Sequence, residues 1–382
     1  MGAAKDFGLG FKIPRAYRQA MQEPVDERKV VFLDPSRDTL PEAFSVMWER
    51  LEADPRFDVQ FISLGKHRAS MPRYLSNCVD AVREVATARL VFICDASDVL
   101  SCIPLRPETS IVQLWHGCGA FKKFGRSTIA LSYGLTEEEL ARHPFYKNLS
   151  LVTVSSPEVE WAYLEAMGLS PDEDIVRPVG VSRTDVFFDG DFHERALRDV
   201  YAAVPQAANK RVVLYAPTFR GKLAHAHAPE MPDFEKLRAA IGDDSIVLVK
   251  HHPMVRSLPQ IPSSCADFVF DVTGGLPIDE LMTVADVLVT DYSSIVFEFS
   301  IFGRPMVFFA PDLKDYETNR DFYYDYEEMT PGPMAATTDE LVDLLADTGR
   351  WFDADEVARF FHKFMRACDG HATDRILEAV GV

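Results

Sequence analysis

The sequence predicts an α/β protein with two domains, each built around a mostly parallel β-sheet that helices cover on both faces. Short apolar runs rich in β-branched residues recur along the chain, and longer segments with helical periodicity separate them. The same alternation occurs in both halves, which indicates two sheets rather than one. With 382 residues, 47% of them hydrophobic, the chain is long enough for two domains that each bury a core.

Short apolar runs are the candidate strands. In the first half they span 30–33, 57–62, 90–94, 111–114, 151–154 and 175–176. In the second half they span 211–215, 245–249, 268–271, 287–290 and 305–309. Helical periodicity is clearest in 41–52 and 74–88, and 353–379 is expected to form one or two helices.

A polar connection divides the chain near residue 190. It covers about 183–191 and precedes a helical segment at 193–204. We therefore expect an N-terminal domain of residues 1–190 and a C-terminal domain of residues 191–382 that carries the last helices. Two doubly wound, Rossmann-like domains that face a cleft resemble the GT-B class of transferases.

Composition and charge exclude several classes of protein. The net charge of -19 argues against a general nucleic-acid binder, which needs a basic surface. The six cysteines are scattered without a C-x-x-C pair, which predicts reduced thiols rather than a disulfide framework. Charges interrupt the N-terminus too early for a signal peptide, and no apolar run approaches the ~20 residues of a membrane span. We expect a protein of the cytoplasm or of the cytoplasmic face of a membrane.

Residues 1–24 differ from the rest of the chain. Apolar side chains such as Phe7 and Phe11 are mixed with basic ones such as Lys12 and Arg15. A basic amphipathic segment can bind an anionic membrane surface, so this segment is a candidate membrane contact. An ordinary docking helix or a frayed terminus is the alternative.

His116 follows a predicted strand, and two lysines, Lys122 and Lys123, come shortly after it. Strand ends in open α/β sheets face the ligand crevice. Because an unperturbed imidazole titrates near neutral pH, a histidine there suits general-base catalysis. The lysines add a positive patch to an acidic protein. The alternative is a histidine held by hydrogen bonds beside a solvated lysine pair.

Hydroxyl, guanidinium and carboxylate side chains follow two strands of the second half. Thr218 and Arg220 offer a hydroxyl and a guanidinium to an anion. Another predicted strand ends before Asp291, and a helix is expected to begin near Ser293 and Ser294. Free backbone N–H groups and hydroxyls at a helix start form a seat for phosphate. A residue that only caps the helix is the alternative.

A pair of histidines follows a third strand of the second half. Lys250, His251 and His252 precede Pro253, which ends the strand and fixes a loop expected to aim His252 into the crevice. Neighbouring side chains of an extended segment point apart, and no acidic or cysteine residue stands at ligand spacing. The sequence therefore predicts no metal site here.

A loop rich in aromatic residues follows the last predicted strand. It contains Tyr316, Arg320 and the run 322–326. Such side chains can stack on a base or close over a ligand, and the alternative is a loop that only packs at the seam between the domains.

In this order and spacing, the motifs resemble the CDP-glycerol glycerophosphotransferase family of teichoic-acid and capsule assembly. The resemblance covers roughly residues 90–376. It is carried by Trp-His-Gly at 115–117 with the lysine pair, Tyr-Ala-Pro-Thr-Phe-Arg at 215–220, His-Pro at 252–253, Thr-Asp-Tyr-Ser-Ser at 290–294, Pro-Gly-Pro at 331–333 and Gly-His-Ala-Thr-Asp-Arg at 370–375. Val-Ser-Ser-Pro at 154–157 and Ser-Arg-Thr-Asp at 182–185 also resemble segments of the family.

The resemblance implies a metal-independent transferase with no cofactor. It implies that His116 is the general base, that His252 contacts the donor phosphates, and that Ser293 and Ser294 lie at the diphosphate. Further candidates are Asp291, Arg220, Thr218 and Lys250 on the donor side, and Lys122 and Lys123 on the acceptor side. The implied donor is CDP-glycerol, bound by the C-terminal domain. The implied acceptor is a hydroxyl of a lipid-linked saccharide or growing polymer, at the inner face of the cell membrane.

Departures from the family pattern keep alternatives open. Residues 117–121, Gly-Cys-Gly-Ala-Phe, replace the Thr-Pro-Leu common in glycerol-phosphate enzymes. The Gly-Ala-Phe-Lys segment at 119–122 resembles ribitol-phosphate relatives, so CDP-ribitol is the alternative donor. In size the chain resembles the priming enzymes of the family. A sugar-nucleotide glycosyltransferase of the same architecture and a saccharide-binding module without turnover are the remaining alternatives.

Overall fold

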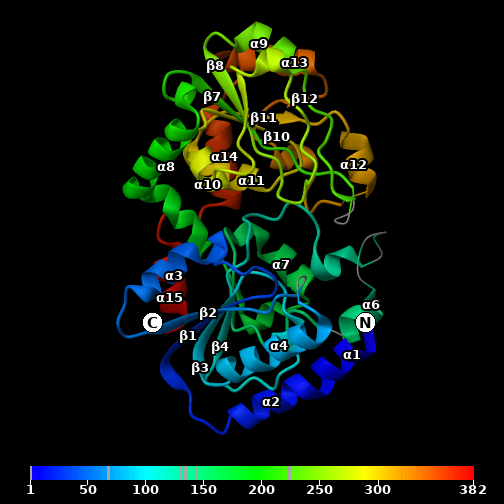
Figure 1. Ribbon diagram of the computed structural model, residues 1–382, viewed down its shortest axis with the longest axis vertical. Helices are drawn as coiled ribbons and strands as arrows, with labels where there is room; N and C mark the ends of the chain where they lie inside the picture. The colour runs from blue at the N-terminus through cyan, green and yellow to red at the C-terminus, as the bar shows by residue number, and fades with distance from the viewer. Residues whose placement is uncertain are drawn as a thin grey trace. The chain divides into compact units, whose positions relative to one another are not determined.

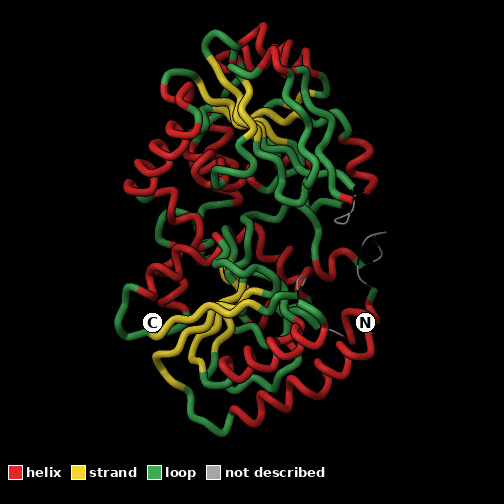
Figure 2. The backbone as a smooth tube through the Cα atoms, in the orientation of Figure 1, coloured by secondary structure: helices red, strands yellow, loops and turns green. Residues whose placement is uncertain are grey.

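The structure, a computed structural model, describes residues 2–66, 69–129, 131, 134, 136–142, 144–221, 225–319 and 321–382. The chain divides into two compact units, each with its own sheet (Figures 1 and 2). The N-terminal unit comprises Met1–Cys118, Lys123–Val186 and Arg366–Val382, and the C-terminal unit comprises Gly119–Lys122 and Phe187–Met365. In the described part of the chain, no helix is long and apolar enough to cross a membrane.

The N-terminal unit is built on six parallel strands in the order β2-β1-β3-β4-β5-β6. They are β1 (Asp26–Asp34), β2 (Asp58–Ser63), β3 (Ala88–Ile93), β4 (Ser110–Gln113), β5 (Leu151–Thr153) and β6 (Val176–Arg177). From β1 the chain runs first to β2 on one side and then to β3 on the other. The topological switch point of the sheet, where ligands bind in doubly wound folds, therefore lies between β1 and β3.

Helices cover both faces of this sheet (Figure 1). Alternate strand residues such as Phe32 and Phe92 pack on one face against Phe44, Met47 and Ile376, which belong to the region of α3 and to α15. On the other face α4 packs against β1 and β3, and α2 packs on α4. The helices of the unit are α1 (Gly2–Phe7), α2 (Ile13–Ala20), α3 (Ser45–Glu52), α4 (Met71–Val85), α5 (Asp98–Ser101), α6 (Glu137–Arg142), α7 (Glu160–Met167) and α15 (Ala372–Ala379).

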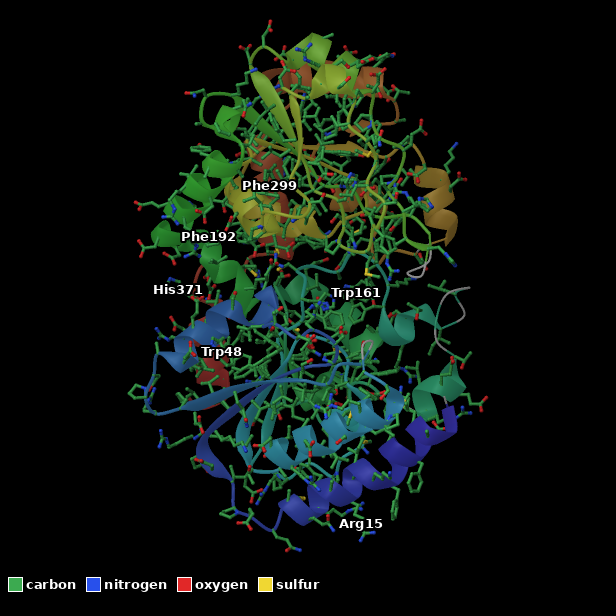
Figure 3. The ribbon with its side chains drawn as sticks, viewed as in Figure 1. Arg15, Trp48, Trp161, Phe192, Phe299 and His371 are labelled. Carbon is green, nitrogen blue, oxygen red and sulfur yellow. The ribbon has the colours of Figure 1, made fainter. Side chains whose placement is uncertain are left out.

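The first helices form one continuous helical segment, in which a π-helical turn (Gly8–Lys12) separates α1 from α2. Leu9 and Tyr17 are buried on its inner side, whereas Phe7 and Phe11 are 54% and 51% exposed. Arg15, on the exposed side of α2, points away from the unit (Figure 3). The segment therefore docks through one face and leaves an aromatic and basic face outside.

The last helix, α15, belongs to the N-terminal unit. Asp185 accepts hydrogen bonds from two backbone N–H groups of its first turn, at 3.0 and 2.7 Å, and so satisfies donors that a helix start leaves unpaired. Arg375 of the helix donates to two backbone carbonyls of the same unit. The predicted C-terminal domain of 191–382 is therefore wrong for residues 366–382.

The C-terminal unit also has six parallel strands, in the order β12-β11-β10-β7-β8-β9. They are β7 (Arg211–Tyr215), β8 (Ser245–Val249), β9 (Val269–Asp271), β10 (Val287–Thr290), β11 (Met306–Phe309) and β12 (Met334–Ala335). The chain moves outward from β7 to β9 and then returns to β10 on the other side of β7. This is the Rossmann strand order, with its switch point between β7 and β10.

One face of this second sheet packs against α9 and α13, where Val213 and Val289 meet Phe234, Leu237 and Leu341. On the other side α8 and α10 pack against each other (Figure 1). The helices of the unit are α8 (Gly190–Ala203), α9 (Phe234–Ile241), α10 (Ile278–Val284), α11 (Ile295–Phe299), α12 (Leu313–Asn319), α13 (Thr338–Ala346) and α14 (Ala354–Phe364).

The predicted α/β fold with two doubly wound sheets is confirmed. Each predicted strand is present, with its ends shifted by a few residues, and 353–379 contains two helices. The sequence analysis missed β12, because a strand of two residues is too short to produce an apolar run. It also missed that Gly119–Lys122, inside the first half of the chain, belongs to the C-terminal unit.

Candidate active site

His116 lies just beyond the carboxyl end of β4, in a loop that Gln113 anchors. The Gln113 amide donates to the carbonyl oxygen of Asp95 at 3.0 Å, and its oxygen accepts from the backbone N–H of Trp115 at 3.1 Å. Trp115 has a φ of 58°, in the left-handed region, which costs of order 1–3 kcal/mol. Strain of this kind beside a titratable side chain is typical of functional sites.

A hydrogen bond of the His116 ring fixes its tautomer. Its Nδ1 atom lies 2.8 Å from the carbonyl oxygen of Cys94, the residue after β3. Because a carbonyl only accepts, Nδ1 carries the proton, and in the neutral ring the lone pair is on Nε2. The side chain is exposed and stacks on Trp115 with ring centroids 4.6 Å apart. In its neutral form, an exposed histidine with this tautomer presents the Nε2 lone pair that a general base requires.

A buried carboxylate that the sequence analysis missed supports the same strand ends. Asp34, the last residue of β1, accepts hydrogen bonds from the backbone of Ser36 and Arg37, and its second oxygen pairs with the Arg37 guanidinium at 2.8 Å. The Cys94 thiol lies 3.8 Å from that oxygen. Burial and the charge of Asp34 raise the pKa of this thiol, which therefore stays protonated. The network fixes the ends of β1 and β3. The orientation of the His116 ring depends on the end of β3, because the ring bonds to the carbonyl oxygen of Cys94 there.

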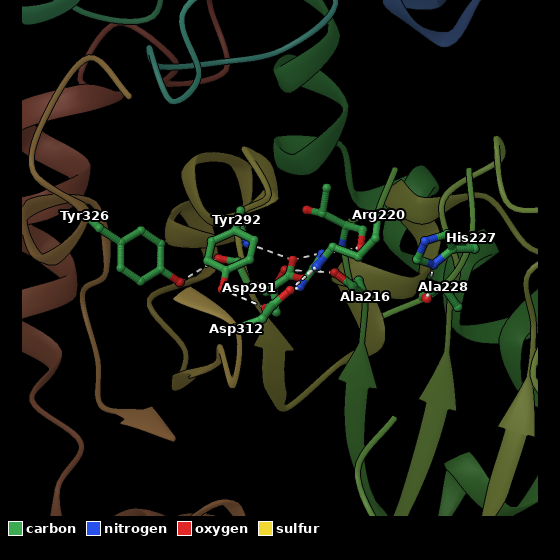
Figure 4. A network of polar contacts seen from close by, with 10 residues as sticks. Ala216, Arg220, His227, Ala228, Asp291, Tyr292, Asp312 and Tyr326 are labelled. Atoms are coloured by element: carbon green, nitrogen blue, oxygen red, sulfur yellow. Dashed lines mark hydrogen bonds and ion pairs between the residues drawn. The ribbon is translucent and has the colours of Figure 1, made fainter. Parts of the chain in front are cut away.

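In the C-terminal unit, Asp291 joins the loops after β7 and β10 at the switch point (Figure 4). Its Oδ1 accepts from the backbone N–H groups of Thr218 and Tyr292, both at 2.7 Å, and its Oδ2 lies 2.9 Å from the Arg220 guanidinium. The residue is 1% exposed. A buried carboxylate requires such partners, so Asp291 ties the two loops together.

Arg220 has a structural role in the same network (Figure 4). Its Nε and Nη2 donate to Asp312 at 2.6 and 2.9 Å, and its Nη1 donates to the carbonyl oxygen of Thr218 at 2.7 Å. Burial acts to raise the pKa of Asp312, but the hydrogen bond and charge of Arg220 outweigh burial and hold that pKa below its usual range. The Tyr292 hydroxyl also donates to Asp312, at 2.9 Å. Arg220 and Asp291 thus shape the loops that carry the other candidates.

Hydroxyl groups lie beside this network. The Thr218 side chain is buried, and its Oγ1 makes no hydrogen bond within the described residues. Ser293 and Ser294 are half-buried and directly precede α11. Ser293 accepts a long hydrogen bond, 3.4 Å, from the backbone of Ile295, and the Ser294 side chain makes no capping bond to the described part of the chain. Helix capping therefore accounts only weakly for the two serines.

His252 has the tautomer opposite to that of His116. Its Nδ1 lies 3.2 Å from the backbone nitrogen of Met254, which can only donate, so in the neutral ring Nε2 carries the proton. The ring lies 4.8 Å from that of Phe219. His252 as a whole is exposed, but partial burial of its ring and, to a smaller extent, the charge of Lys122 lower its pKa. A neutral imidazole with an N–H at Nε2 suits donation to a phosphate oxygen.

Lys250 fixes a neighbouring loop. Its ammonium donates to the carbonyl oxygens of Thr273 and Leu276, which belong to the loop after β9. The backbone N–H of His251 also bonds to that loop, at the Thr273 hydroxyl, 3.0 Å away. The Lys250 ammonium is therefore bonded to the loop after β9.

The two predicted acceptor-side lysines fall in different units. Lys123 belongs to the N-terminal unit and Lys122 to the C-terminal unit. The backbone of Lys122 forms an isolated β-bridge with Phe322, and its ammonium lies 5.5 Å from the centroid of the Tyr316 ring. Lys122 is thus located in the unit that carries the donor-side candidates.

The aromatic-rich loop packs against the Asp291 network. The Tyr316 ring stacks on Tyr292 with centroids 3.7 Å apart, and the Tyr326 hydroxyl donates to the carbonyl oxygen of Asp291 at 2.9 Å. Arg320, which was also singled out, lies outside the described residues. Among the described residues, no group of three or more His, Cys, Asp or Glu side chains could hold a metal ion.

Comparison with known proteins identifies the family of the chain. Residues 15–381 match the family described as CDP-Glycerol:Poly(glycerophosphate) glycerophosphotransferase. The chain belongs to this family. The resemblance found in the motifs is therefore confirmed over nearly the whole chain.

Named relatives include ribitol-phosphate and glycerol-phosphate members of the family. The chain is 35% identical over 360 residues to the teichoic acid poly(ribitol-phosphate) polymerase of Bacillus spizizenii (strain ATCC 23059 / NRRL B-14472 / W23). The alignment covers 94% of this chain and 56% of that protein. The chain is 33% identical over 379 residues to the teichoic acid ribitol-phosphate primase of the same strain, covering 98% and 95%. It is 28% identical over 282 residues to the teichoic acid glycerol-phosphate primase of Bacillus subtilis (strain 168), covering 73% and 70%. The chain thus spans just over half of the polymerase and nearly all of the ribitol-phosphate primase.

Solved structures confirm the GT-B-like fold. The wall teichoic acid polymerase TagF, in a variant soaked with CDPG, aligns with a TM-score of 0.78 at 19% identity, covering 97% of this chain and 93% of that chain. Another TagF structure aligns with a TM-score of 0.76 at 19% identity, covering 96% and 92%.

Proposed function

We propose that the protein is a CDP-alditol phosphotransferase, which moves an alditol phosphate from a CDP-activated donor to a hydroxyl acceptor and releases CMP. Membership of the family supports this class of reaction. The observation that carries the proposal for this chain is the hydrogen bond from His116 to Cys94, 2.8 Å long. It makes Nε2 the proton acceptor at the carboxyl end of β4.

In the proposed reaction, His116 Nε2 takes the proton of the acceptor hydroxyl while the acceptor oxygen attacks the β-phosphorus of the donor. The bond from this phosphorus to the bridging oxygen breaks, and CMP leaves with the electron pair. General-base catalysis of this kind contributes about 10²–10⁴-fold. Orientation of the acceptor oxygen in line with the leaving group adds to the rate.

Donor binding is assigned to side chains of the C-terminal unit. His252, which carries its proton on Nε2, and the hydroxyls of Ser293 and Ser294 are proposed to hold the diphosphate. The buried Thr218 hydroxyl is a further candidate, because an anion would supply the hydrogen bond that it does not make within the described chain. No catalytic metal is included in this scheme.

Arg220, Asp291 and Lys250 are proposed to act mainly by positioning. Arg220 is bonded to Asp291 and Asp312, and Lys250 to two loop carbonyls, so these groups hold the loops from which the donor ligands project. A buried, charge-balanced network provides the rigid support that a phosphate site requires.

We infer that the alditol is ribitol, although the motifs alone placed glycerol first. Four relatives that are 30–35% identical over most of the chain carry ribitol-phosphate names. The named glycerol-phosphate relatives are 27–29% identical. The Gly-Ala-Phe-Lys segment at 119–122, which resembles ribitol-phosphate enzymes, supports the same choice.

The acceptor is proposed to be a lipid-linked saccharide at the inner surface of the cell membrane. The face of the N-terminal helical segment that carries Phe7, Phe11, Lys12 and Arg15 supports this location, because exposed aromatic and basic side chains together bind anionic headgroups. Phe7 and Phe11 stack on each other, with centroids 5.5 Å apart. An ordinary docking helix would bury such rings against the protein.

A donor comparison tests the proposal. The purified protein is supplied with a lipid-linked saccharide acceptor and, in separate reactions, with CDP-ribitol, CDP-glycerol or a UDP-sugar, and CMP is measured by chromatography with and without a chelator. We expect CMP from CDP-ribitol at a rate at least about tenfold above that from CDP-glycerol, which corresponds to about 1.4 kcal/mol of discrimination. Faster release from CDP-glycerol would reverse the choice of alditol. The absence of CMP from both donors, with binding of the UDP-sugar alone, would overturn the proposed function.

A further inference from the structure

Four residues of the first half of the chain are built into the C-terminal unit. They are Gly119–Lys122, three to six positions after His116. Phe121 is 4% exposed, and its ring meets Phe322 and Phe297 edge-on, with centroids 5.4 and 6.1 Å apart. The Phe121 carbonyl accepts a hydrogen bond of 3.1 Å from the backbone of Tyr323. The segment is thus anchored by apolar packing and by backbone pairing.

Gly119 lies where the C-terminal unit leaves no room for a side chain. Its φ is +63°, and a Cβ atom added there would lie 2.3–2.5 Å from carbons of the Phe297 ring. A larger residue would therefore have to displace an aromatic ring that is fully buried. Phe297 belongs to α11, the helix that follows Ser293 and Ser294. The segment Gly119–Lys122 therefore packs against the short helix that the two serines precede.

The anchor determines where Lys122 lies. Its backbone bridges to Phe322, and its ammonium lies 5.5 Å from the centroid of the Tyr316 ring. Tyr316 in turn stacks on Tyr292, the neighbour of Ser293. The positive charge of Lys122 is also close enough to lower the pKa of His252, second to the effect of burial. Lys122 thus lies among the candidate ligands of the donor, although the sequence suggested the acceptor side.

We propose that Lys122 binds the diphosphate of the donor beside His252 and stabilises the charge that develops on CMP as it leaves. The assignment rests on the proposed function. When the bond between the β-phosphorus and the bridging oxygen breaks, the electron pair stays on the phosphate of CMP, and the proton of the acceptor is on His116. An ammonium beside that phosphate stabilises the charge where it appears. Lys123, in the other unit, has no part in this step.

Donor affinity of paired variants tests this assignment. The dissociation constants of CDP-ribitol and CMP are measured by calorimetry for the wild type, Lys122→Met, Lys122→Arg and Lys123→Met. Loss of a charge-assisted contact is expected to weaken donor binding of Lys122→Met roughly 10- to 100-fold. Lys122→Arg should recover most of the loss, and Lys123→Met should bind the donor within about twofold of the wild type. Wild-type affinity in Lys122→Met, or an equal loss in Lys123→Met, would overturn the assignment.

A second readout separates a phosphate ligand from a residue that only packs. The His252 ring is titrated by NMR in the wild type and in Lys122→Met, with Lys122→Gln as a substitute if the methionine variant does not fold. Removal of the positive charge should raise the pKa of His252, and an unchanged titration would contradict the proximity on which the assignment depends.

If the wild type itself neither binds nor turns over CDP-ribitol and CDP-glycerol, the proposed function fails. If the wild type is active and the Lys122 variants bind the donor as tightly as the wild type does, this inference alone fails.

Discussion

The Nδ1 atom of His116 lies 2.8 Å from the carbonyl oxygen of Cys94, whereas the Nδ1 atom of His252 lies 3.2 Å from the backbone nitrogen of Met254. The first contact requires a proton on Nδ1, and the second requires a lone pair there. In their neutral forms the two histidines therefore present opposite groups at Nε2: an acceptor on His116 and a donor on His252. The backbone contacts thus give each ring the Nε2 group that its proposed role requires, general base for His116 and phosphate ligand for His252.

This difference predicts how glutamine variants behave. A glutamine amide can donate to a phosphate in place of an imidazole N–H, but it cannot take a proton at neutral pH. His252→Ala is expected to slow CMP release about 10²–10³-fold, as loss of a donor to a developing charge does. His252→Gln should recover at least about tenfold of that loss. Initial rates of CMP release measure both, and equal rates for the two variants would argue against the donor role.

Buried His251 predicts that stability falls in acid. The side chain is 2% exposed, and burial lowers its pKa despite the opposing charge of Asp271. The unfolded chain therefore takes up a proton near pH 6.5, before the folded protein does. The contribution of His251 is fully present above that pH and is lost as the pH falls through the lower folded pKa, by at most about 1.4 kcal/mol per pH unit.

Urea unfolding at pH 7.5 and pH 5.5 checks this prediction. His251→Gln should lose less stability between the two pH values than the wild type does. His362→Gln, at an exposed histidine of α14, is the matched control and should keep the wild-type difference. An identical pH dependence in His251→Gln would contradict the prediction.

Arg220 is expected to matter for stability as well as for activity. Arg220→Met leaves the carboxylate of Asp291, which is 1% exposed, without its charged partner. Removing one member of a buried pair costs about 3–5 kcal/mol. Lys236→Met, which breaks an exposed pair with Asp339, should have little effect on the free energy of unfolding, because solvent screens the pair.

Chemical denaturation of a double-mutant cycle checks the Arg220 prediction. Asp291→Asn keeps an oxygen that can accept the backbone N–H groups of Thr218 and Tyr292, so adding it to Arg220→Met should restore part of the lost stability. If Arg220→Met is no less stable than Lys236→Met, the network does not hold the loops together.

The exposed face of α1 and α2 is expected to bind anionic lipid. Phe7→Ser combined with Phe11→Ser should reduce co-sedimentation with vesicles of phosphatidylglycerol and phosphatidylcholine, because each ring buries apolar area among the headgroups. Phe188→Ser is the control, since Phe188 is 49% exposed in the other unit. Vesicle binding that survives the double substitution, or that Phe188→Ser reduces equally, would contradict the membrane role.

The sequence predicted those parts of the molecule that depend on local pattern. Buried parallel strands appear as apolar runs, and polar motifs at their ends placed both His116 and His252 at the correct edges of their sheets. Asp34 stands at the end of such a run, so the same rule would have found it. The partner of His116 could not be found in this way, because it is the backbone carbonyl of Cys94, which carries no side-chain signal.

Assignment of segments to units could not be predicted either. Gly119–Lys122 and Arg366–Val382 each join the unit formed by the other half of the chain. The contacts responsible, Phe121 among aromatic rings and Asp185 at the start of α15, link residues far apart in sequence. Local propensity contains no information on such contacts, and this is why Lys122 was grouped with Lys123.

The most direct test of the account is a single measurement on His116. CMP release from CDP-ribitol with a lipid-linked acceptor is followed for the wild type and His116→Gln, together with the dissociation constant of the donor. We predict that the variant binds CDP-ribitol within about twofold of the wild type but releases CMP about 10²–10⁴-fold more slowly, because the proton acceptor is gone. Full CMP release by His116→Gln would contradict the account.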